Sequence, residues 1–116
     1  MQNAELCSVL PLEIRKQALL RLGTILSDLR NRWKSGDKEL EDWALRVQAV
    51  NAWFTSESLL TALSAWTDTL RAESVEAWLN SYPDLMADRK PRTIGVINAG
   101  NIPWVGLHDA LCVFLS

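Results

Sequence analysis

The spacing of apolar residues changes once along the chain, after a polar stretch at residues 84–92. Before that stretch, apolar residues recur every three or four positions, which is the period of amphipathic helices. After it, residues 93–97 have the sequence Thr-Ile-Gly-Val-Ile, a β-branched run typical of a buried strand. The change predicts a mostly α chain, with a helical region at residues 1–90 and the start of an α/β domain at residues 91–116.

Four helices are predicted in the first region. Pro11 suits the first turn of the first helix, where its missing N–H costs nothing, and Gly36 is a suitable C-terminal stop. Thr55 is a good N-cap for the third helix, and Pro83 ends the fourth because the residue before a proline avoids helical backbone. The four apolar stripes are Ala18, Leu22, Ile25, Leu26, Leu29 and Trp33; Leu40, Trp43, Ala44, Val47 and Val50; Leu59, Leu63, Trp66 and Leu70; and Val75, Trp78, Leu79 and Tyr82. We expect the tryptophans to anchor the core rather than to form a cofactor site.

Charge and hydropathy limit the classes of partner. The 116 residues carry a net charge of −2, without the basic stripe that nucleic-acid binders use. The basic group Arg89, Lys90 and Arg92 is interrupted by Pro91, and we expect a solvated linker there rather than an anion site. The N-terminus lacks the features of a secretory signal, and no run of about 18 apolar residues exists. We therefore expect no nucleic acid, no membrane span and a cytoplasmic protein.

Residues 98–103, with the sequence Asn-Ala-Gly-Asn-Ile-Pro, form a predicted turn between the strand and an apolar helix that starts at Trp104. Ligands of open α/β sheets bind at the carboxyl ends of strands, beside helix N-termini that offer free N–H groups. The GxGxxG fingerprint of ordinary dinucleotide sites is missing. The order of elements still predicts a phosphate or dinucleotide site at this turn.

The predicted last helix has no C-terminal stop signal and ends on the apolar sequence Cys-Val-Phe-Leu-Ser. One buried strand cannot satisfy its backbone hydrogen bonds alone, because a parallel strand needs neighbours on both sides. We therefore expect a truncated α/β domain that self-associates, as a homo-oligomer, through the unpaired strand. The alternative is that this helix packs on the four-helix part and ends the domain.

The segment GVINAGNIPWVGLHDALCVFLS, residues 95–116, resembles the start of the catalytic core in acyl-CoA reductases of the aldehyde dehydrogenase superfamily. These are related to the fatty-acid reductase of bacterial bioluminescence. The matching elements are the strand at residues 95–97, the turn ending in Asn101-Ile102-Pro103, and the apolar helix that follows. Residues 51–55 and 78–83 resemble the helical N-terminal region of the same branch, so the likeness covers much of the chain.

The resemblance implies a parent enzyme that uses NADPH (or NADH) to reduce a fatty acyl-CoA to an aldehyde through a cysteine thioester. Asn101 matches the asparagine that donates its amide to the oxyanion, a role that suits a preorganised neutral donor. The backbone of Asn98, Ala99 and Gly100 would run beside the cofactor, and Gly100 would permit close approach. Without the resemblance, Asn101 would be interpreted as a turn former. The catalytic cysteine would lie downstream, so this chain alone is expected to be inactive.

Three other polar residues of the last helix are weaker candidates. His108 and Asp109 are adjacent, so their side chains should diverge on a helix and not act as a pair. Cys112 is rejected as a nucleophile because it lies on an apolar face with no basic neighbour. Cys7 and Cys112 match no metal or redox spacing, so no metal site is predicted.

Two further hypotheses stay open. The chain could be a non-catalytic helical interaction module, because apolar, tryptophan-rich stripes also mark interfaces. It could instead belong to another branch of the superfamily, such as a semialdehyde or acyl-phosphate reductase.

Overall fold

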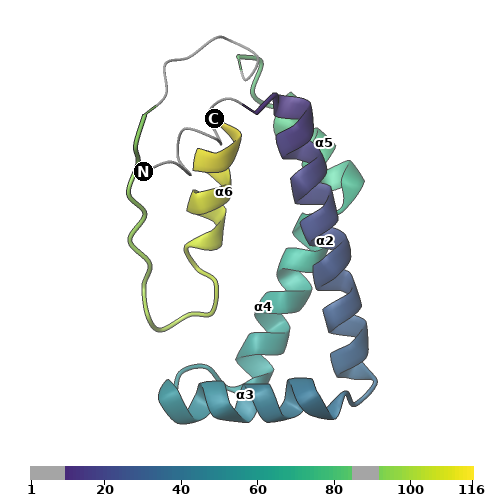
Figure 1. The fold of residues 1–116 in the computed structure, drawn as a ribbon, viewed down its shortest axis with the longest axis vertical. Helices are drawn as coiled ribbons and strands as arrows, with labels where there is room; N and C mark the ends of the chain where they lie inside the picture. The colour runs from purple at the N-terminus through teal and green to yellow at the C-terminus, as the bar shows by residue number, and fades with distance from the viewer. Residues whose placement is uncertain (1–9, 85–91) are drawn as a thin grey trace.

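The computed structural model describes residues 10–84 and 92–116, and the regular structure within them is helical. The helices are α2 (Leu12–Lys34), α3 (Lys38–Val50), α4 (Ser56–Thr69), α5 (Ala72–Asn80) and α6 (Leu107–Leu115). α2 and α4 run side by side in opposite directions, α3 crosses their lower ends, and α6 contacts α2 (Figure 1). The predicted mostly α character is confirmed, and each of the four helices expected before residue 84 is present.

The end of α2 is set by Gly36, as expected. Its φ of 82° lies in the left-handed region that favours glycine. The Gly36 N–H donates to the Trp33 carbonyl at 3.0 Å, and the Asp37 N–H donates to the Arg32 carbonyl at 3.1 Å. These two bonds form a Schellman motif, which satisfies carbonyls that the helix end leaves free. At the other end, Pro11 occupies the N-cap position, one residue before the helix.

Side-chain caps start the next two helices. The Asp37 carboxylate accepts from the backbone N–H groups of Glu39 and Leu40, at 3.0 and 3.2 Å. The Thr55 hydroxyl accepts from the Ser58 N–H at 3.1 Å, which confirms Thr55 as the N-cap of α4. These caps are local, because each joins residues two or three positions apart.

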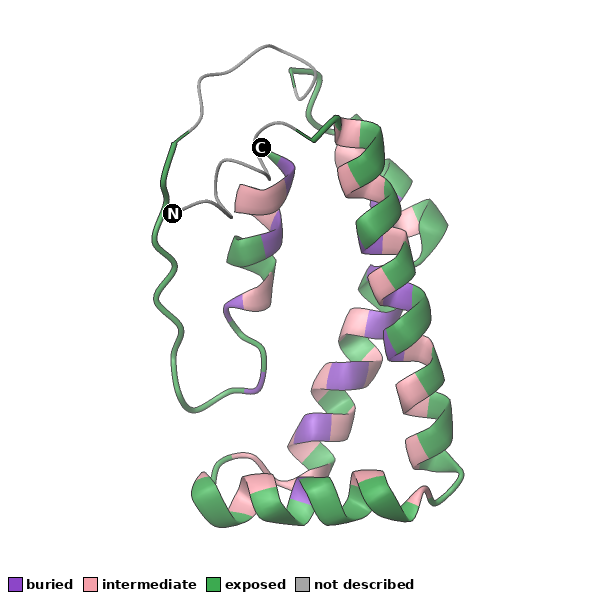
Figure 2. Cartoon of the chain, viewed as in Figure 1, coloured by how far each residue is buried: buried purple, intermediate pink, exposed green. Residues whose placement is uncertain are grey.

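The hydrophobic core is shared by α2, α4, α5 and α6. The buried residues of its main cluster are Leu19, Leu26, Leu63, Leu70, Val75, Leu111 and Leu115. Figure 2 shows the buried positions on the facing sides of these helices. α6 therefore packs on the helical region that precedes residue 84, while the domain boundary predicted between residues 90 and 91 lies outside the described residues.

The buried face of α2 is rotated from the predicted stripe. Leu19 and Gly23 are buried, whereas Ala18 and Ile25, which the stripe included, are exposed. A Cβ added at Gly23 would lie 2.6 Å from the Leu70 carbonyl oxygen, which is too close for any real side chain. Gly23 thus allows α2 and α4 to approach closely, a role that the spacing of large apolar residues does not show.

α3 is the least buried of the helices. Ala44 is its buried residue, while Trp43 and Val50, also on the predicted stripe, are exposed. The Trp43 ring meets Trp33 edge to face, with centroids 6.1 Å apart. The prediction that tryptophans anchor the core is confirmed for the three that are partly buried against it, Trp33, Trp66 and Trp78. The other three are exposed: Trp43, Trp53 and Trp104.

Residues 93–97 form no strand in the described structure. They run as an extended segment, and every residue from 92 to 102 is exposed, including Ile97 at 98%. The strand–turn–helix expected here therefore lacks its buried strand. The physical reason is that a strand requires a pairing partner, and none of the described residues lies in a strand that could supply one.

The helix expected from Trp104 begins three residues later, at Leu107. Trp104 has a φ of 58°, which lies outside the right-handed helical region, so the helix cannot include this residue and begins after it. The far end of α6 is held by α2. The Arg15 guanidinium donates to the carbonyls of Phe114 and Leu115, at 3.1 and 2.7 Å. A cation at this end also complements the helix dipole.

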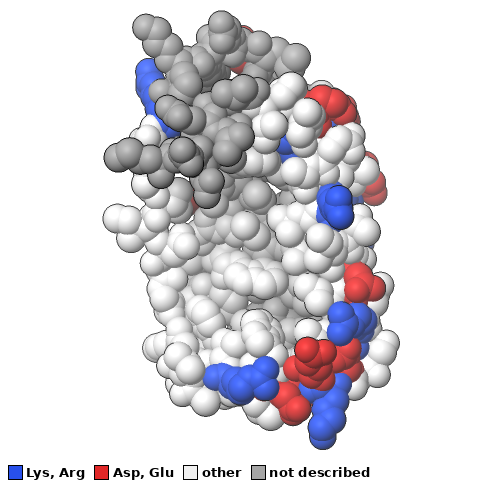
Figure 3. Space-filling model, viewed as in Figure 1, with Lys and Arg blue, Asp and Glu red and all other residues white. Residues whose placement is uncertain are grey.

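Charged side chains are unevenly distributed over the surface. Figure 3 shows Lys, Arg, Asp and Glu mixed along the side formed by α2 and α3, with few charges on the rest of this face. Within the described parts of the chain, no helix has the length and apolar character needed to cross a membrane.

Candidate functional site

The turn predicted to hold the site lies open to solvent. Asn98, Ala99, Gly100 and Asn101 are all exposed. The Asn51 amide donates to the Gly100 carbonyl at 2.8 Å, which ties the turn to the connection between α3 and α4. This tether joins residues 49 positions apart, so sequence spacing could not reveal it.

The start of α6 is packed against Asn98. Gly106 is the buried N-cap residue of α6. A Cβ added at Gly106 would overlap the side-chain oxygen and carbon of Asn98, so the glycine makes room for that side chain. At Gly100, in contrast, an added Cβ would meet nothing within 4 Å. The space beside Gly100 is therefore open, and the close approach of a cofactor there stays a prediction.

The predicted cofactor residues do not enclose a nicotinamide cofactor by themselves. Asn98, Ala99 and Gly100 form an exposed stretch, and none of them lines the cavity between α5 and α6. Small-molecule sites usually bury most of their ligand. The turn accordingly offers donors and acceptors at its surface but lacks the walls of a dinucleotide site.

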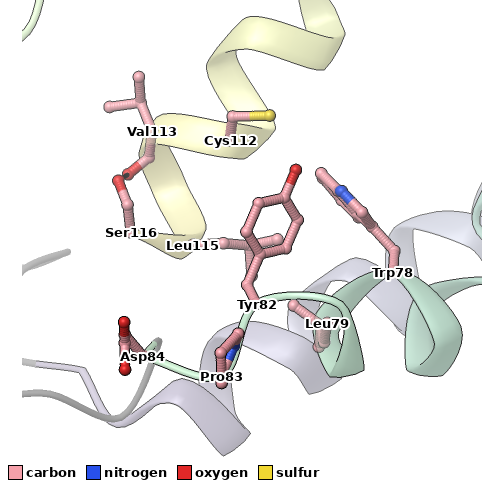
Figure 4. Close-up of a pocket in the computed structure, with 9 residues that line it drawn as sticks. All are labelled: Trp78, Leu79, Tyr82, Pro83, Asp84, Cys112, Val113, Leu115 and Ser116. Atoms are coloured by element: carbon pink, nitrogen blue, oxygen red, sulfur yellow. Dashed lines mark hydrogen bonds between the residues drawn. The ribbon is translucent and has the colours of Figure 1, made fainter.

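A cavity of about 420 Å³ lies between the end of α5 and α6. Its lining residues are labelled in Figure 4 and are mostly apolar. α5 ends at Asn80, and the Tyr82 N–H donates to the Leu79 carbonyl at 3.1 Å. After this turn, the Tyr82 side chain points toward α6 (Figure 4). The volume is within the range of small-molecule sites.

A free thiol borders this cavity. Cys112 is half-buried, and its Sγ points toward Trp78, above the Tyr82 hydroxyl (Figure 4). Both ring nitrogens of His108 lie 3.8 Å from Sγ, and the His108 ring meets the Trp78 ring with centroids 5.8 Å apart. The stated reason for rejecting Cys112, that it has no basic neighbour, is therefore wrong. The sequence does contain a sign of this neighbour: His108 and Cys112 are four residues apart, which places them on one face of a helix.

His108 and Asp109 do not form a close pair. Their nearest side-chain atoms, Nδ1 and Oδ1, are 3.6 Å apart, and both side chains are largely exposed. This separation is too long for an effective hydrogen bond. Among residues 10–84 and 92–116, no group of three or more His, Cys, Asp or Glu side chains could hold a metal ion.

Ion pairs on α2 shift pKa values at the surface. Hydrogen bonds from Arg32, at 2.8 and 3.0 Å, lower the pKa of Asp37, and the N-cap bonds from backbone N–H groups add to this effect. A hydrogen bond to Glu76 raises the pKa of Lys16 and joins α2 to α5. These pairs stabilise the helical frame and take no part in either candidate site.

No protein-family model matches the chain, and no curated protein or solved structure matches it either. The function proposed below therefore depends on the motif at residues 95–109 and on the geometry of the two regions just described.

Proposed function

We propose that this chain is the N-terminal part of an acyl-CoA reductase that uses NADPH or NADH to convert a fatty acyl-CoA to an aldehyde through a cysteine thioester. The observation that carries the proposal is the exposed GVINAGNIP segment. Its β-branched residues are uncovered, with Ile97 98% exposed. An apolar, extended and unpaired run of this kind is a template for pairing with another strand. In the proposal, the remainder of an α/β sheet supplies that strand.

Asn101 is the oxyanion donor in this proposal. Its side chain is exposed at the turn, while the neighbouring Gly100 carbonyl is held by Asn51. A neutral amide at a fixed position can stabilise developing negative charge without moving a proton. The tether from Asn51 would therefore be a positioning element that acts on Asn101 through the backbone of the turn.

The chain by itself is expected to lack activity. The described residues form no walls around a cofactor, so NADPH and fatty acyl-CoA are ligands of the assembled protein rather than of this segment. Titration of the isolated chain with NADPH, followed by nucleotide fluorescence, should show no saturable binding.

The first test is the nucleotide sequence that follows the codon for Ser116. The proposal expects an open frame that encodes a glycine, then an apolar strand leading to a lysine. A stop codon with no dehydrogenase-like sequence beyond it would contradict the proposal.

The second test uses the longer protein encoded by that frame. Asn101→Ala should reduce kcat for acyl-CoA-dependent NADPH oxidation by about 10²–10³-fold, the cost of one oxyanion donor, with little change in KM. Asn80→Ala, at the exposed end of α5, is the matched control and should leave kcat unchanged. An Asn101→Ala enzyme with full kcat would exclude the oxyanion role.

A helical interaction module is the second candidate function, and the apolar surface at the end of α3 and in the connection after it favours this function. Val50 is 91% exposed and Trp53 is 72% exposed, although both are apolar. Exposed apolar patches mark interaction surfaces. A monodisperse monomer with a cooperative melt would favour this function. Concentration-dependent association that Ile97→Lys abolishes, and Val50→Lys leaves intact, would favour the reductase.

A further inference from the structure

The cavity between α5 and α6 combines an apolar wall with one nucleophile. The thiol of Cys112 faces the cavity from α6, opposite Trp78 on α5 (Figure 4). Leu79 and Val113 supply further apolar surface. Such a space favours an apolar ligand, and the thiol offers that ligand a covalent bond.

His108 is placed to act as the base for this thiol. Its ring nitrogens lie 3.8 Å from Cys112 Sγ, within reach of a sulfur hydrogen bond. The imidazole side chain is 60% exposed, so it can exchange protons with water. Its ring also packs against Trp78, which lines the cavity, with centroids 5.8 Å apart. A thiol with an adjacent base is the usual arrangement of an activated cysteine.

The polar group across from the thiol indicates which ligand fits. The Tyr82 hydroxyl points into the space between Cys112 and Trp78 (Figure 4). A phenol can donate a hydrogen bond to a carbonyl oxygen. The indole and phenol rings of Trp78 and Tyr82 offer flat apolar surfaces. A planar, conjugated molecule with one carbonyl matches these surfaces, the donor and the thiol together.

We propose that this cavity captures apolar α,β-unsaturated carbonyl compounds, with Cys112 as the nucleophile and His108 as the base. The residues involved are separate from the turn at residues 98–101, so the inference does not depend on the proposed reductase function. It adds a covalent binding site to the helical part of the chain.

The reaction is a conjugate addition that needs no other reagent. His108 takes the proton from the Cys112 thiol, and a sulfur electron pair forms a bond to the β-carbon of the ligand. The π bond between the α- and β-carbons breaks, and its electrons move to give an enolate whose oxygen accepts a hydrogen bond from Tyr82. The imidazolium of His108 then returns the proton to the α-carbon. No group leaves, and no net oxidation or reduction occurs.

The test exposes the full chain to benzylideneacetone, an aryl enone, and follows adducts by intact mass and peptide mapping. Cys7 is an internal comparator, since its peptide is mapped separately. We expect modification at Cys112 to exceed that at Cys7 by at least about tenfold, because burying one aromatic ring adds to the effect of the base at His108. The preference should vanish in concentrated urea and should be smaller with acrylamide, which has no apolar group.

Variants distinguish the contribution of the base from that of the cavity to the rate of addition. His108→Gln should slow the addition at Cys112 by at least about tenfold for both reagents, because the proton acceptor is lost. Val113→Trp should slow the enone and leave acrylamide unaffected, because it fills the cavity. Ala110→Ser, on the exposed face of the same helix, is the matched control and should react normally. Circular dichroism establishes that each variant is folded.

Equal modification of Cys7 and Cys112 in the folded chain would overturn the proposal. So would a preference that survives in urea, or a folded Val113→Trp variant that reacts with the enone at the normal rate. Unchanged rates in a folded His108→Gln variant would show that His108 is not the base, and this result would also overturn the proposal.

Discussion

The packed pair of α2 and α4 and the extended segment at residues 92–102 contain similar apolar residues in opposite environments. Leu19 on α2 is 1% exposed, whereas Ile97 is 98% exposed. Both side chains would gain by leaving water. The difference shows that burial depends on whether a complementary surface is present, and only the helices find one within the described chain.

Backbone hydrogen bonding explains why the two regions diverge. A helix satisfies its own N–H and C=O groups, so α2 needs its neighbours only to cover its apolar side. A strand leaves these groups free until another strand binds them. Residues 93–97 therefore stay extended and exposed, however well their composition suits a sheet.

The largest expected effect contrasts one core residue with one exposed residue. Leu19→Ala should lower the free energy of unfolding by about 2–5 kcal/mol, because it leaves a cavity in the core. Ile97→Ala should change it by less than about 0.5 kcal/mol, as for other surface sites. Urea denaturation followed by circular dichroism measures both. Comparable losses in the two variants would show that the extended segment is covered in solution.

Two glycines provide the next contrast. Gly23→Ala should lower the free energy of unfolding by about 1–3 kcal/mol, because its Cβ would collide with the Leu70 carbonyl. This loss should occur although alanine favours a helix over glycine by about 1 kcal/mol. Gly95→Ala is the control, since its Cβ would meet nothing within 4 Å. A stabilised Gly23→Ala would refute the close approach of α2 and α4.

The hydrogen bond that joins the extended segment to the connection between α3 and α4 can be removed at Asn51. Asn51→Ala removes the hydrogen bond to the Gly100 carbonyl, worth about 0.5–1.5 kcal/mol. Amide exchange at residues 98–101 should become faster, while the urea midpoint should move only slightly. Asn80→Ala should leave exchange in the turn unchanged. Unaltered exchange in Asn51→Ala would mean that the turn is held by other contacts.

The smallest expected effect is the pH dependence of the cap at Asp37. Its pKa is lowered from the ordinary value of 3.8, chiefly by Arg32, so its contribution to stability is complete above that value. The contribution is lost as the pH falls through the lowered pKa. Asp37→Asn keeps the capping group but not the charge, and should weaken this part of the acid response. Asp42→Asn, at an exposed position in the first turns of the same helix, should respond to acid as the unsubstituted chain does.

Part of the functional geometry could be foreseen from the sequence and part could not. Asn98 to Asn101 lie in one exposed stretch, with bends at Gly100 and Asn101, but the contact from Asn51 is long-range and has no sequence pattern. The spacing of His108 and Cys112 was visible, although their contact depends on α6 being helical from Leu107 onward. The cavity beside them depends on how the end of α5 meets α6, which no local pattern specifies.

The sequence by itself determined the helices and their caps. Gly36, Asp37 and Thr55 act on residues within five positions, so their chemistry is complete locally. Tertiary structure decided which side of α2 is buried, because Gly23 takes its role from Leu70, the residue that caps the end of α4. It also decided that residues 93–97 stay extended. A strand is completed only by a partner, and the composition of one segment cannot supply that partner.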